Sequence, residues 1–138
     1  MKRFFVLFLA LGSFSCIKKA IEQKQEDLVV KAVTDGQWKV TWYECNNQYV
    51  NDYYLPYAFQ FKTNNTVDAV NNGSVENTGT WTASAETKTI KSNFSNTSSN
   101  ALLFLNYTWT ITGSSWTSVN AMRVNGPGDT CRMHMEKL

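Results

Sequence analysis

Apolar and polar residues alternate with a period of two along most of the chain from residue 35 onward, and this pattern constrains the fold more than any other feature. Trp38, Val40 and Trp42, for example, are separated by polar or smaller side chains. Side chains two residues apart lie on the same face of a β-strand. The alternating segments are divided by pairs such as Asn72-Gly73, which are typical of tight hairpin turns. The pattern therefore predicts many short antiparallel strands.

About eight such strands can be counted, with no helical pattern between them, which favours an antiparallel sandwich or barrel. A closed barrel is preferred because closure removes the sheet edges, and eight strands leave an interior that side chains fill or that holds one small ligand. A membrane-spanning barrel is disfavoured because the outward positions carry Thr, Lys, Asn and Gln instead of an apolar band. We therefore predict an all-β, eight-stranded up-and-down barrel. One long strand is expected to place Leu103, Leu105, Tyr107, Trp109 and Ile111 on one face.

Residues 1–15 have the pattern of a secretory signal peptide. Lys2 and Arg3 precede the apolar run FFVLFLAL, which is far shorter than the ~20 residues of a membrane-spanning helix. Ser15 then precedes Cys16, in an arrangement that resembles the lipobox of bacterial lipoproteins, whose cysteine is acylated. We expect cleavage after residue 15 and lipidation of Cys16. The alternative is an ordinary cleaved signal that leaves Cys16 as a free thiol.

The resemblance to lipoproteins also implies a location. Ile17 follows the cysteine, where many lipoproteins retained in the inner membrane carry aspartate, so the outer membrane is expected. No acidic run follows the cysteine, which favours the periplasmic leaflet over the cell surface. Residues 16–34 would form the lipid-anchored tether. Its last part has apolar residues at roughly helical spacing, typical of a short helical plug for one end of the barrel: Leu28, Val29, Ala32 and Val33.

The net charge of the chain belongs to its signal peptide. The whole sequence has thirteen basic and eleven acidic residues, but Lys2 and Arg3 lie in the segment that we expect to be removed. The mature chain then has equal numbers of both signs. A neutral chain lacks the positive surface that nucleic acid or an acidic partner would need, so nucleic-acid binding is not expected.

The residues needed for an enzyme or a metal site are largely missing from the sequence. His134 is the only histidine, and no nucleophile elbow, phosphate loop or metal-spaced Cys/His cluster occurs. Met133 and Met135 flank His134 and could suggest a copper site. On a regular strand, however, His134 would point to the opposite face from both methionines. We therefore expect no catalytic residue, no bound metal and no cofactor.

Several short motifs occur in an order that resembles bacterial lipocalin-like lipoproteins. Gly36-Gln37-Trp38 opens the first strand after a short helical stretch, as the Gly-x-Trp signature does in lipocalins. The resemblance covers about residues 28–138. The motifs that follow in order are Tyr57–Phe61, Gly79–Trp81 and Trp109–Ile111. The resemblance implies a lipocalin-like barrel at 35–138 that Trp38 closes at one end, with Lys137 as the basic residue packing over that tryptophan.

The same resemblance implies a cup, meaning the barrel interior, with the loop Asn46–Pro56 as a lid at the end opposite Trp38. Two functions fit this layout. The first is binding of a small apolar or aromatic molecule in the cup by a monomeric protein. The second is a structural or protein-interaction lipoprotein whose core is filled by the same rings. The candidate ligand-binding residues are Trp42, Tyr53, Tyr54, Phe59, Trp81, Tyr107 and Trp109.

A disulfide is expected between Cys45 and Cys131. The first and last strands of a closed up-and-down barrel pair antiparallel, and if Trp38 lies opposite Leu138, then Cys45 lies opposite Cys131. The compartment of an exported protein permits disulfide formation, and lipidation of Cys16 leaves two cysteines that can pair. The same register places outward-facing residues of the first strand opposite inward-facing residues of the last strand. A β-bulge near either cysteine is therefore expected. The alternative is two buried free thiols.

Overall fold

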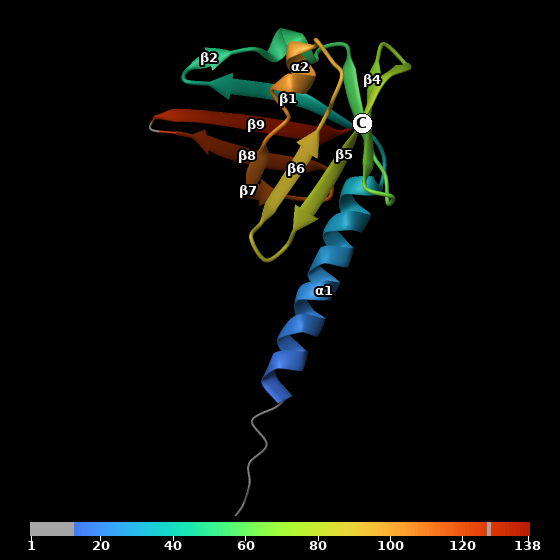
Figure 1. Ribbon diagram of the computed structural model, residues 1–138, viewed down its shortest axis with the longest axis vertical. Coiled ribbons are helices and arrows are strands. Elements are labelled where there is room, and N and C mark those ends of the chain that lie inside the picture. The colour runs from blue at the N-terminus through green and yellow to red at the C-terminus, as the bar shows by residue number, and fades with distance from the viewer. Residues whose placement is uncertain (1–12, 127) are drawn as a thin grey trace, which may run out of the picture.

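The computed structural model describes residues 13–126 and 128–138. One sheet curls into a barrel above a long N-terminal helix (Figure 1). In chain order, the elements are α1 Ser13–Thr34, β1 Trp38–Cys45, β2 Gln48–Tyr49, the 3-10 helix η1 Asn51–Tyr54, β3 Tyr57–Phe61, β4 Thr66–Asn71, β5 Ser74–Ser84, β6 Thr89–Asn93, α2 Asn100–Leu103, β7 Thr108–Ser114, β8 Ser118–Asn125 and β9 Asp129–Lys137.

Eight of the strands form a closed barrel. β1 and β3 to β9 pair antiparallel in chain order, and β9 pairs with β1 to complete the circle. β1 meets β3 only where Trp38 pairs with Phe59. β2 stays outside the circle and forms a short hairpin with the end of β1. The prediction of an all-β, eight-stranded antiparallel barrel is therefore confirmed.

Asparagine and glycine make the tightest turns, as their positions in the sequence predict. Asn71 pairs with Ser74, so the turn between β4 and β5 contains only Asn72 and Gly73. Both have positive φ, 47° and 85°. Positive φ at both turn positions matches the twist of a hairpin, and asparagine and glycine tolerate it best.

A bulge in β1 decides which of its aromatic side chains face the core. The pairing with β9 shifts by one residue between Val40 and Trp42. Trp38 and Val40 are buried, and beyond the bulge it is Tyr43 that enters the core, while Trp42 stays outside the core cluster. A one-residue shift moves every later side chain to the other face. A bulge was expected, but it lies at Thr41 instead of beside a cysteine. Trp38 therefore lies opposite Lys137 and not opposite Leu138 as expected, and the expected register holds only from Trp42 onward.

Aromatic rings fill most of the barrel. Tyr43 stacks on Tyr54 with ring centres 5.3 Å apart and meets the edge of Trp109 at 5.6 Å. Such packed interiors leave few voids. The largest fully buried side chains are Trp81, Trp109, Tyr43, Tyr54, Phe59, Leu102 and Val67.

The segment before β7 differs from the long strand expected over 103–111. It forms the short helix α2 and a turn, and β7 begins only at Thr108. Asn106 stabilises this conformation, because its side chain accepts a hydrogen bond from the Phe94 N–H at 2.6 Å and donates one to the Phe94 carbonyl at 2.7 Å. With α2 in place, Leu102 and Leu105 are buried.

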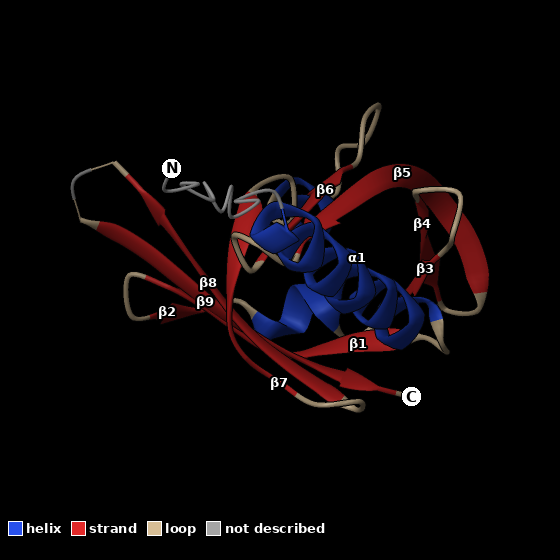
Figure 2. Ribbon diagram, turned by 90° about the horizontal axis from the view of Figure 1, so that it is seen from below, coloured by secondary structure: helices blue, strands red, loops and turns tan. Residues whose placement is uncertain are grey.

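α1 ends next to the start of β1 and extends away from the barrel, and seen from below it lies in front of the barrel (Figures 1 and 2). The helix is longer than the short plug expected, because it includes the whole predicted tether from Cys16 to Thr34. Among the described residues, no helix has the length and apolar character needed to cross a membrane. Most of the predicted signal peptide lies outside the described residues.

Candidate functional site

The predicted cup holds almost no free space. Tyr54, Phe59, Trp81 and Trp109 are all buried in one core cluster. The cavity between the side chains of the core measures only about 30 Å³, which is enough for one water molecule. These four candidate ligand-binding residues are therefore together, but they pack against the core and leave no room for a ligand.

The other three candidate residues do not join them. Trp42 lies beyond the bulge and pairs with Tyr49, with ring centres 6.0 Å apart. Tyr53 is exposed and packs against Phe104, with ring centres 6.1 Å apart. Tyr107, also exposed, lies beside Arg123. The bulge accounts for Trp42, and the late start of β7 accounts for Tyr107.

The end expected to be an open mouth is closed. The loop after β1 starts at the other end of this strand from Trp38, as expected, but its η1 helix packs against α2 (Figure 1). Tyr54 donates a hydrogen bond to the Ala101 carbonyl at 3.0 Å, and Tyr43 donates one to the Phe104 carbonyl at 3.1 Å. Burial raises the pKa of Tyr54, so its hydroxyl stays neutral and keeps its proton for this bond.

A larger space lies at the Trp38 end, between α1 and the turns that join β5 to β6 and β7 to β8. We call this space the α1 cleft, and its volume is about 440 Å³. The lining is mainly apolar, with Lys88 and several serines and threonines at the edge. The apolar side chains that line it are Val29, Ala32 and Val33 of α1, Trp38, and Ala83, Ala85, Ile90, Ile111 and Val119 of the barrel. It is far larger than the cavity inside the barrel.

Trp38 joins α1 to the barrel at one side of this cleft. Its ring is 2% exposed, and its indole N–H donates to the Val33 carbonyl at 2.9 Å. The Lys137 ammonium lies 5.3 Å from the centre of the ring and also pairs with Asp35 at 3.2 Å. A cation over an indole face is attracted by the ring. Lys137 thus packs over the Trp38 ring, as the resemblance to lipocalins implied.

Two other depressions are lined mainly by polar side chains. One, of about 470 Å³, lies over β5 and β6 and includes Thr80, Lys91 and Asn93. The other, of about 280 Å³, includes Glu44 and Arg132. A small-molecule site usually combines a mainly apolar lining with a few polar groups. The α1 cleft fits that description better than either depression.

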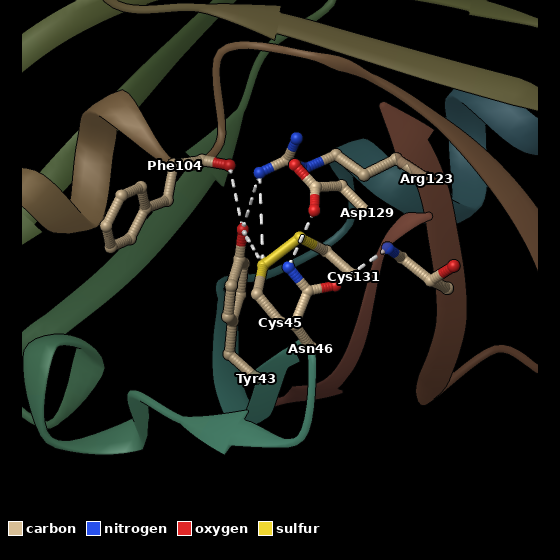
Figure 3. Close-up of a disulfide and its surroundings, with 8 residues drawn as sticks. Tyr43, Cys45, Asn46, Phe104, Arg123, Asp129 and Cys131 are labelled. Atoms are coloured by element: carbon tan, nitrogen blue, oxygen red, sulfur yellow. Dashed lines mark hydrogen bonds between the residues drawn. A yellow bond between two sulfur atoms is a disulfide. The ribbon is translucent and has the colours of Figure 1, made fainter. Parts of the chain in front are cut away.

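The disulfide between Cys45 and Cys131 is present and joins β1 to β9 (Figure 3). The two residues are directly opposite each other, with Cα atoms 4.1 Å apart. Beside them, Asn46 donates to the Asp129 carboxylate at 2.8 Å and accepts from the Thr130 N–H at 3.1 Å. Of the third cysteine, Cys16, the structure describes only the backbone position in α1.

The Met-His-Met stretch has the alternation expected of a regular strand. Met133 and Met135 are buried in the core, whereas His134 points outward and bonds Asn120 Oδ1 at 2.7 Å and Glu136 Oε1 at 3.2 Å. The three side chains therefore cannot hold one ion. Across the described part of the chain, no group of three or more His, Cys, Asp and Glu residues is arranged to hold a metal.

No protein-family model matches the chain, and no curated protein matches it. A solved structure does resemble it: a DUF4847 family protein from Bacteroides vulgatus, with a TM-score of 0.57 and 16% sequence identity. The similarity covers 78% of this chain and 96% of that one. At this identity the likeness shows the fold alone, a barrel of the same kind.

Proposed function

We propose that this protein is a lipid-anchored envelope lipoprotein that binds a small apolar or aromatic molecule in the α1 cleft. The contrast between two volumes carries the proposal: about 440 Å³ in the cleft against about 30 Å³ inside the barrel. Small-molecule sites commonly measure ~300–1,000 Å³ and have a mainly apolar lining. The proposed monomer acts by binding alone, without catalysis, metal or cofactor.

The anchor is Cys16, acylated after removal of residues 1–15, and the membrane is the outer membrane on its periplasmic side. A helix from Cys16 to Thr34 is about 30 Å long at the usual rise per residue. It would hold the barrel away from the bilayer with the α1 cleft on the side facing the membrane. Lys18 and Lys19 follow the anchor and would meet the anionic head groups. This arrangement suits a ligand that partitions into lipid.

Membrane fractionation tests the anchor. Cys16→Ala removes the acylated thiol, so the protein should become soluble or remain unprocessed. Ser15→Ala keeps a small residue before the cysteine and should stay in the membrane fraction. A processed Cys16→Ala protein that still fractionates with the membrane would contradict lipid anchoring.

Fluorescence titration with the neutral apolar probe N-phenylnaphthylamine tests the cleft. Val29 and Leu28 are neighbours on α1 and both are exposed, but only Val29 lines the cleft. Val29→Glu should weaken probe binding at least tenfold, because it places a carboxylate against the apolar ligand. Leu28→Glu adds the same charge outside the cleft and should leave the affinity within about twofold of the parent. Equal effects of the two variants would argue against this site.

A second candidate function is a structural or protein-interaction lipoprotein that binds no small molecule. The filled barrel interior favours this second function, because the aromatic rings expected to bind a ligand pack against one another. Native mass spectrometry of protein purified from its own host separates the two candidates. A co-purified small molecule supports binding in the α1 cleft, whereas consistently empty protein supports the interaction role.

A further inference from the structure

Arg123 is a buried cation without a negative partner. It lies on β8 with 7% of its surface exposed, and none of the ion pairs between described residues includes it. The carboxylate of Asp129 accepts a hydrogen bond from Asn46, and no ion pair between it and Arg123 occurs among the described residues (Figure 3). An uncompensated charge inside a protein destabilises the fold. Its position therefore calls for a compensating negative charge.

Three buried N–H groups around Arg123 also lack an acceptor. Arg123 Nη2 donates to the Tyr43 hydroxyl at 3.3 Å, but Nε and Nη1 have no partner within the described part of the chain. The same is true of Trp109 Nε1, whose ring centre lies 5.2 Å from the guanidinium carbon. Nearly all buried donors in native proteins bond to protein, water or a ligand. Three orphan donors in one cluster indicate a missing acceptor.

The tyrosines in the cluster do not supply the negative charge. Burial raises the pKa of the Tyr43 hydroxyl, although Arg123 acts in the opposite direction. Tyr43 is therefore neutral at neutral pH. Tyr107 covers one face of the guanidinium, with its ring centre 3.6 Å from the guanidinium carbon, and it is itself 39% exposed. The attraction between cation and ring compensates only part of the charge.

We propose that Arg123, together with Trp109 Nε1, binds the carboxylate group of a small organic acid. The planar guanidinium presents forked donors that match the two oxygens of a carboxylate, and the indole N–H adds a third donor. The single negative charge compensates the buried cation. Access from solvent would require displacement of the Tyr107 ring, which covers the guanidinium and is partly exposed. The site lies at the disulfide end of the barrel and is independent of the α1 cleft.

Nitrogen–proton correlation NMR tests the proposal on the mature protein, with sodium acetate as the probe at constant ionic strength. Acetate should shift the Arg123 Nε–H and Trp109 indole N–H signals along a saturable curve. The indole N–H groups of Trp38 and Trp81 already donate to the Val33 and Lys62 carbonyls, so their signals should stay in place. If the Arg123 and Trp109 signals do not move, or drift without saturation together with those of Trp38 and Trp81, the proposal is wrong.

Thermal unfolding of two matched variants adds an independent measurement. Binding to the native state raises the unfolding temperature, so acetate should stabilise the parent and the Arg132→Met variant, whose arginine is exposed. Arg123→Met should lose the saturable part of this stabilisation. An equal acetate response in both variants would overturn the proposal. If Arg123→Met does not fold, the NMR titration of the parent still decides.

Discussion

Cys45 of β1 and Cys131 of β9 are directly opposed and bonded, so the first and last strands of the barrel are covalently joined at one end. The bond closes a loop between residues 86 positions apart. By restricting the unfolded chain, a disulfide over so long a loop contributes about 2–4 kcal/mol.

Reduction of the disulfide should lower the free energy of unfolding by that amount, as should the paired substitution of Cys45 and Cys131 by serine. Urea unfolding with and without reductant measures the difference. The serine variant should not respond to reductant. Alkylation of both cysteines in unfolded, unreduced protein would show that the bond does not form.

Trp38→Ala should lower the free energy of unfolding by about 3–5 kcal/mol, because it removes a large buried ring and leaves a cavity between α1 and the barrel. The control is Trp116→Ala, since Trp116 is exposed and its loss should cost no more than about 0.5 kcal/mol. Chemical denaturation of both variants gives the comparison. Similar decreases in the free energy of unfolding for the two variants would mean that Trp38 does not stabilise the contact between α1 and the barrel.

Gly79→Ala should destabilise the protein by about 1–3 kcal/mol through overpacking. A Cβ atom at Gly79 would lie 2.5 Å from the Asn93 carbonyl oxygen and 2.8 Å from the Phe94 ring, so β5 and β6 would have to separate. At Gly113 the Cβ would make only an ordinary 3.5 Å contact with Asn120. Gly113→Ala should therefore change the stability by no more than about 0.5 kcal/mol, which thermal or urea unfolding can check.

Asp68 should make stability depend on pH. A hydrogen bond from Lys62, with a 2.6 Å contact between the two side chains, holds the pKa of Asp68 below its ordinary value. A depressed pKa means that the contribution is fully present above the ordinary pKa and is lost as the pH falls through the folded-state value. Asp68→Asn should thus destabilise the protein at neutral pH and make little difference in strong acid. Glu86→Gln, at an exposed turn, should show no such trend.

The strands, the barrel closure and the pairing of Cys45 with Cys131 could be predicted because each depends on period-two alternation and on turn residues that the sequence shows directly. The register at the start of β1 could not, because the bulge shifts Trp38 by one residue to lie opposite Lys137. The bulge at Thr41 could not be placed, because both Trp42 and Tyr43 are aromatic and either could face the core. The conformation of the segment before β7 could not be predicted either. It depends on Asn106 bonding to Phe94, a contact between residues twelve apart that no local pattern reveals.

The candidate sites were harder to predict than the fold. The sequence places aromatic residues on many strands, but only the three-dimensional packing shows that they fill the barrel. The α1 cleft arises between a helix and two distant turns, so no motif marks it. The position of Arg123 could have been recognised from the alternation. It lies two residues from the buried Ala121 on β8, so a charged residue falls on the core face.

Methyl NMR with N-phenylnaphthylamine tests the central claim, that a ligand occupies the α1 cleft and not the barrel interior. Ile111 lines the cleft, whereas Met133 and Met135 line the small cavity inside the barrel, and the exposed Ile21 on α1 lines neither. We predict that the probe shifts the Ile111 methyl signal and leaves those of Ile21, Met133 and Met135 in place. Shifts at Met133 and Met135 with Ile111 unchanged would place the ligand inside the barrel and contradict this account.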